Sequence, residues 1–107
     1  MPKFMLKVSY NAEGVRAVVK QGGTARVAAA RALIESLGGS MESFYFAMGG
    51  DDAIVIVDMP DTTAALAASM AVNASGTVTG SFVQLVTAAE VDAATRVSTA
   101  AYKPPTA

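Results

Sequence analysis

The chain of 107 residues contains no cysteine and no histidine. Without cysteine it has neither disulfides nor thiol chemistry, which suits a cytoplasmic protein. Without histidine, the common zinc sites, haem ligands and histidine-dependent catalytic triads are excluded. We therefore predict no metal and no cofactor. Any catalysis would need another group, such as a lysine or an aspartate, whose pKa is strongly perturbed.

Charge is also scarce, because 16% of the residues are charged against about 25% in a typical protein. The net charge is −1 and the eight basic residues are scattered along the chain, so no nucleic-acid-binding footprint is visible. Apolar residues make up 52% of this small domain, and a domain of this size is marginally stable alone. We expect part of the apolar surface to be buried between copies of the chain.

Long apolar runs are missing as well. The first seven residues lack the apolar segment of a signal peptide. Residues 62–89 carry no charge, but polar residues and glycines interrupt them, so they make a poor membrane span. We expect one cytoplasmic domain over residues 1–97, without a membrane partner. A mobile tail is expected over residues 98–107, which include two adjacent prolines.

What is present is a regular alternation of strand and helix patterns. Apolar residues with a period of two, or in short β-rich runs, predict strands over residues 3–10, 41–48, 53–57 and 77–86. The middle two form a hairpin around Gly49-Gly50-Asp51-Asp52. Residues suited to helix N-caps precede four helical segments, and these are Asn11, Thr24, Asp61 and Thr87. The first two segments meet at Gly22-Gly23.

The order β-α-β-β-α-β predicts an α+β, ferredoxin-like sandwich with a four-stranded antiparallel sheet. Its first helical segment is split in two, and a further helix follows the last strand. Helices cover one face of such a sheet, and the other face should then be polar. Here the hairpin strands offer apolar groups to both faces. We expect a second copy to cover the open face, giving a homodimer or a higher homo-oligomer.

Several short segments together resemble the GYD-domain family, and the resemblance covers roughly residues 2–92. The segments are Lys7-Val8-Ser9-Tyr10, Gly22-Gly23-Thr24, Glu35-Ser36-Leu37-Gly38-Gly39, Phe44-Tyr45-Phe46, Val55-Ile56-Val57-Asp58 and Pro60-Asp61. The resemblance implies a bacterial protein of the dimeric α/β-barrel type, in which two ferredoxin-like sheets pack face to face. In the hairpin turn Gly49 and Asp52 match the family signature, whereas Asp51 stands where the family has a tyrosine.

Three polar residues of the predicted sheet are candidate ligand-binding residues, namely Lys7, Tyr45 and Asp58. They would line a cavity between sheet and helices, or between two sheets. Tyr10 is a further hydrogen-bond anchor, although buried tyrosines commonly serve only to satisfy their own hydroxyl group. Asp58 ends an apolar strand, where a partly buried carboxylate needs a partner, and we expect Lys3 or Lys7 to supply it.

The remaining aspartates have simpler explanations than a Mg²⁺ or Ca²⁺ site, although such ions prefer carboxylate oxygens. Asp51 and Asp52 suit a turn, where aspartate bonds its own backbone. Asp61 suits the N-cap of a helix.

Two functions fit these observations, and whether the protein is an enzyme stays open. The first is an oligomeric small-molecule-binding barrel, for which the resemblance allows cofactor-independent oxygenation or isomerisation. The alternative is a non-catalytic structural, assembly or interaction protein whose sheet serves only oligomerisation. A cavity of at least about 300 Å³ with convergent polar groups would favour the first, and a solidly packed sheet would favour the second.

Overall fold

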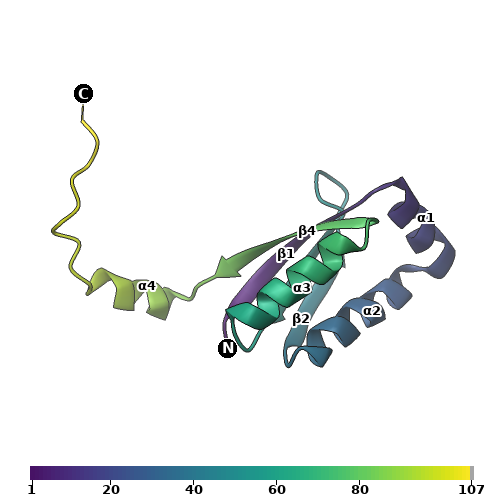
Figure 1. The fold of residues 1–107 in the computed structure, drawn as a ribbon, viewed down its shortest axis with the longest axis horizontal. Helices are drawn as coiled ribbons and strands as arrows, with labels where there is room; N and C mark the ends of the chain where they lie inside the picture. Colours follow the sequence, from purple (N-terminus) through teal and green to yellow (C-terminus); the bar gives the residue numbers. More distant parts are fainter. Residues whose placement is uncertain (107) are drawn as a thin grey trace.

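An antiparallel sheet of four strands carries helices on one of its faces (Figure 1). The structure is a computed structural model that describes residues 1–106. The strands are β1 (Lys3–Tyr10), β2 (Ser40–Phe46), β3 (Ala53–Asp58) and β4 (Val78–Leu85). The helices are α1 (Ala12–Gln21), α2 (Gly23–Ser36), α3 (Thr62–Ala74) and α4 (Ala88–Thr95). The sheet order β2-β3-β1-β4 confirms the predicted ferredoxin-like α+β fold.

Three of the four predicted helix caps are confirmed. The side-chain oxygen of Asn11 accepts the Gly14 N–H at 2.9 Å, and that of Asp61 accepts the Ala64 N–H at 2.8 Å. Thr87 and Glu90 form a complete capping box at the start of α4. Such side chains satisfy N–H groups that the first helical turn leaves unpaired.

The fourth cap, Thr24, was predicted wrongly. α2 begins at Gly23, and its N-cap is Gly22, which has no side chain to bond. Gly22 adopts φ +89°, which L side chains rarely do. A single glycine therefore turns the chain from α1 into α2, and Thr24 already lies within the first helical turn.

The core lies between the sheet and the helices. Side chains alternate along the two central strands, so β1 and β3 each send every second residue to the helix side. On β3, Val55 and Val57 are buried there, while Ile54 and Ile56 are half-buried on the opposite face. The buried core comprises Phe4, Leu6, Val8, Ile34, Ala53, Val55, Val57, Met59, Ala65 and Ala68.

α3 packs on the sheet through alanines rather than through its larger residues. Ala65 and Ala68 are buried, whereas Leu66 and Met70 are 57% and 63% exposed. The Asn73 side chain also holds the edge strand β4. Its amide donates to the Gly80 carbonyl at 3.0 Å and accepts the Gly80 N–H at 2.9 Å.

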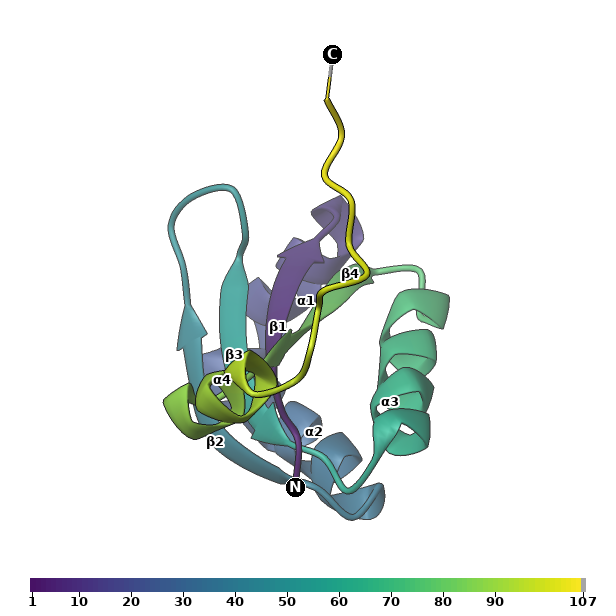
Figure 2. The ribbon, with the colours of Figure 1, turned by 90° about the vertical axis from the view of Figure 1, so that its left-hand side faces the viewer.

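The C-terminal segment leaves the sandwich beyond the end of β4. Figure 1 shows α4 and residues 96–106 projecting away from the sheet, and in Figure 2, which is seen from that end, α4 lies in front of the strands. Every hydrogen bond described for residues 88–106 has its partner within residues 87–106. Residues 98–106 form neither helix nor strand, and residue 107 of the predicted tail lies outside the described residues. None of the helices in the described chain has the length and apolar character needed to cross a bilayer.

Candidate functional site

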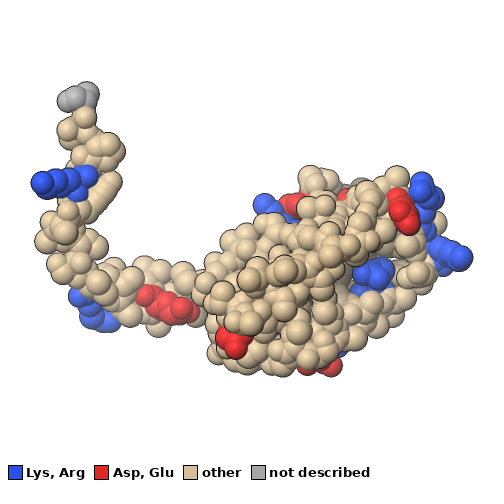
Figure 3. Space-filling view, viewed as in Figure 1, with Lys and Arg blue, Asp and Glu red and all other residues tan. Residues whose placement is uncertain are grey.

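A cleft of about 320 Å³ lies between the sheet and the helices of the chain. Its floor is formed by apolar residues of the central strands, Leu6, Val8 and Val55. Its walls come from α1 and α2 on one side and from α3 on the other. In the space-filling view, a hollow with a basic side chain in it lies between α3 and the α1–α2 pair (Figure 3).

The cleft exists because the helices stand apart and carry short side chains where they face each other. α2 packs on β2 and α3 packs on β4, which are the two edge strands of the sheet. A gap therefore lies between these helices, over the central strands β1 and β3. Alanines line this gap on all three helices, namely Ala17, Ala29, Ala30 and Ala71. Well-packed interiors leave few voids larger than a water molecule, so an apolar gap of this size is unusual in a core.

Few polar groups converge on the cleft, and most of the lining is apolar. The polar side chains are those of Tyr10, Gln21, Arg26, Ser75 and Thr77. The Ser75 hydroxyl donates to the Val72 carbonyl at 2.8 Å and so has a local partner. Among the described residues, Arg26 is the only charged one that lines the cleft. It is half-buried and forms no ion pair within residues 1–106.

The predicted residues Lys7, Tyr45 and Asp58 lie on the opposite, open face of the sheet. Lys7 and Tyr45 are both register partners of Ile54, so the structure brings these two side chains to the same part of that face. Asp58 lies further along it, opposite Lys3. None of the three lines the cleft. As ligand-binding residues they stay a prediction for a site between two sheets.

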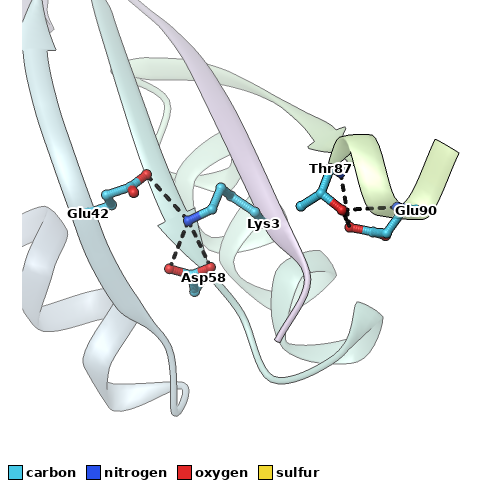
Figure 4. A network of polar contacts seen from close by, with 5 residues as sticks. All are labelled: Lys3, Glu42, Asp58, Thr87 and Glu90. Carbon is cyan, nitrogen blue, oxygen red and sulfur yellow. Dashed lines mark hydrogen bonds and ion pairs between the residues drawn. The ribbon is translucent and has the colours of Figure 1, made fainter. Parts of the chain in front are cut away.

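The partner predicted for Asp58 is confirmed to be Lys3. The Lys3 ammonium lies 3.0 Å from an Asp58 carboxylate oxygen and 3.3 Å from a Glu42 oxygen (Figure 4). The hydrogen bond to Asp58 raises the pKa of Lys3 above its ordinary value of 10.5, although desolvation opposes the shift. This network joins β1, β2 and β3 at one end of the open face.

The hairpin turn is tied to β1 by its two aspartates. An Asp52 carboxylate oxygen accepts the Tyr10 N–H at 2.8 Å, and the Asp52 N–H donates to the Val8 carbonyl at 2.8 Å. Asp51, which stands in the place of the family tyrosine, lies 3.8 Å from the Lys7 ammonium. Across the described part of the chain, no three acidic side chains come together to hold a metal ion. The expected bonds of Asp51 and Asp52 to their own backbone are wrong, because the hairpin places both residues beside the end of β1. Asp61 caps α3 as predicted.

A sequence model of the GYD domain matches residues 4–95. The chain belongs to the GYD-domain family. This confirms the resemblance that the sequence motifs indicated. No curated protein and no solved structure matches this GYD-domain chain. The matched region ends at the last residue of α4, so the GYD match includes the helix that projects from the sandwich.

Arg26 lines the cleft but was not predicted from the sequence. The available signal was its position in α2, four residues before Ala30, because residues four apart share a helix face. Ala30 is an apolar residue of that helix and lines the cleft. A charged residue on the same helix face as an apolar residue indicates where the buried surface has a polar end.

Proposed function

We propose that this GYD-domain protein binds a small organic molecule in the cleft of each protomer. The cleft volume of about 320 Å³ carries the proposal, because pockets for small ligands start at roughly 300 Å³. Its lining has the usual character of such a site, in which apolar walls hold the ligand and a few polar groups orient it. Tyr10, Arg26 and Thr77 would be the orienting groups.

The side chains of the cleft support binding more directly than turnover. Oxygenation or isomerisation without a cofactor would need a group that moves a proton at the substrate. Tyr10 is the candidate for that role, since its phenol is both a donor and an acceptor. We therefore propose ligand binding as the function of the cleft. Cofactor-independent oxygenation or isomerisation in the same cleft is the more specific proposal.

The open face favours self-association as a second function. Met5 is the register partner of Ile56 on one side and of Val83 on the other, so these three residues form an apolar row across the sheet. Ion pairs of Lys3 and Lys7 with aspartates flank this row. We propose that a second copy covers the row, because exposed apolar patches with polar rims mark interaction sites. The assembly is proposed to be cytoplasmic.

A thermal-shift screen of small alcohols, carboxylates and aromatic compounds tests the binding proposal. A compound that binds only the folded protein must raise its melting temperature. Ala30→Leu, which would place a larger side chain in the cleft, should reduce or abolish the shift. Ala67→Leu is the matched control, because Ala67 is exposed on α3 and does not line the cleft.

The binding proposal fails if no compound stabilises the wild-type protein, or if both leucine variants respond alike. Light scattering tests self-association separately. A monomer at micromolar concentration would remove the proposed sheet-to-sheet partner and leave the cleft unaffected.

A further inference from the structure

We infer that the cleft takes a small amphipathic carboxylate, whose charged end pairs with Arg26 and whose hydrocarbon body lies over the apolar floor. This inference rests on the proposed binding function and names the ligand class. It follows from the charge of the lining, from the position of its polar groups and from the short side chains of its walls.

The charge of the cleft has one sign. Arg26 is the only charged residue that lines it within residues 1–106, so no carboxylate of the described chain balances its guanidinium there. Arginine is charged at every accessible pH, and a partly buried charge is costly without a partner. An anionic group on the ligand would supply that partner in the same place.

The neutral polar groups gather at the end of the cleft where β1 passes into α1. Tyr10 is the last residue of β1, and the Thr77 carbonyl accepts the Asn11 N–H at 3.1 Å. Figure 1 shows α1 and the start of α2 at this same end of the sheet. Gln21 and Arg26 lie on either side of the junction between these two helices. The polar lining residues therefore belong to one end of the fold.

The rest of the lining is apolar and would contact the hydrocarbon part of the ligand. From Arg26, α2 continues to Ala30, Leu33 and Ile34, all of which line the cleft. Phe44 and Phe82 add aromatic surface on the flanking strands. A molecule with one charged end and an apolar body matches this division, whereas a neutral hydrocarbon would leave Arg26 without a partner.

A carboxylate fits better than a more highly charged group. One guanidinium offers a planar pair of N–H donors that matches the two oxygens of a carboxylate. The hydroxyl groups of Tyr10 and Thr77 and the amide of Gln21 are uncharged donors. A dianionic phosphate ester would bring a second negative charge for which the described lining has no cation.

Calorimetric titration with hexanoate and with 1-hexanol tests the inference, because the two probes differ only at the polar end. Hexanoate should bind wild type at least about tenfold more tightly, since hydrogen bonds to charged groups contribute more than neutral ones. Arg26→Gln should remove this preference and leave the affinity for 1-hexanol unchanged. Arg31→Gln is the matched control, because Arg31 lies on the same helix, is exposed and does not line the cleft. Arg26→Lys keeps the charge and should retain part of the preference.

The outcomes separate the ligand class from the binding function. If 1-hexanol binds as tightly as hexanoate and Arg26→Gln changes nothing, the carboxylate inference is wrong and the cleft remains a binding site. If hexyl phosphate binds more tightly than hexanoate, the choice of carboxylate is overturned in favour of a phosphate ester. If none of the three probes binds wild type, the carboxylate inference is wrong, and the thermal-shift screen then decides the proposed binding function separately.

Discussion

The two faces of the sheet are built from the same strands and carry different groups. On the helix side, apolar residues form the core and the floor of a cleft with one arginine. On the open side, an apolar row lies between the ion pairs of Lys3 and Lys7. β3, which is apolar at every position except Asp58, thus contributes to two surfaces. One holds the helices and, as we propose, a ligand, and the other is the proposed contact with a second copy.

Adjacent residues of β3 give the largest test of this difference. Val57 is fully buried on the helix side, and Ile56 is half-buried on the open side. Val57→Asp places a charge in the core at a cost of several kcal/mol, against a total stability of about 5–15 kcal/mol. We expect circular dichroism to show loss of the fold. Ile56→Asp should keep the fold and prevent the proposed association with a second copy, which light scattering measures. Equal loss of structure in both variants would contradict the comparison.

Two methionines sharpen the comparison between the helix side and the hairpin. Met59 follows β3 and is fully buried, whereas Met48 is fully exposed next to the hairpin turn. Met59→Ala should reduce the free energy of unfolding by about 2–5 kcal/mol, and Met48→Ala should change it by less than about 0.5 kcal/mol. Urea denaturation measures both values. A large effect at Met48 would indicate that a partner covers the hairpin tip.

Asp52 and Asp51 allow a hydrogen bond to the backbone to be compared with a surface ion pair. Asp52→Ala removes the acceptor of the Tyr10 N–H and should cost about 1–3 kcal/mol. Asp51→Ala removes a 3.8 Å contact with Lys7 and should cost less than about 1 kcal/mol. The same denaturation experiment applies to both variants. If the two losses are equal, Asp52 does not hold the turn to β1 as the geometry indicates.

The smallest predicted effect is the pH dependence of the stability that the Lys3 network contributes. Because the pKa of Lys3 is raised in the folded protein, its contribution to stability is fully present below the ordinary lysine value of 10.5. It is lost as the pH rises through the raised value. The stability difference between wild type and Lys3→Gln should therefore stay constant around neutral pH and shrink above pH 10.5. Urea midpoints across that range measure it, and an unchanged difference would show that Lys3 acts through packing alone.

The architecture was predictable because it depends on local patterns. Period-two alternation marked β1, and capping side chains marked the starts of α1, α3 and α4. The start of α2 was not predictable in the same way. The pair Gly22-Gly23 marked the junction of the two helices, but it did not show that Gly22, through its positive φ, is itself the N-cap of α2.

The candidate site was predictable only in part. The sequence selected Lys7, Tyr45 and Asp58 without deciding which face of the sheet they share, and the register of the strands places them on the open face. An ion pair of Asp58 with Lys3 or Lys7 was foreseen, and the structure shows Lys3. A cavity between sheet and helices was one of the two predicted locations, but the residues that line it were not foreseen, because they depend on how far apart two helices stand. Helical spacing shows that Ala30 faces the sheet, but it does not show that Ala71, far along the chain, leaves space opposite it. Arg26 can be recognised as a candidate binding residue only once this space is known.

Amide NMR spectra recorded during a titration with hexanoate would compare the two faces most directly. If the ligand occupies the cleft, signals of Tyr10, Arg26, Ala30, Ala71 and Thr77 should shift together. Signals of Lys7, Tyr45 and Ile54 on the open face should stay in place. Shifts confined to the open face would contradict the proposed cleft and would favour a ligand held between two sheets.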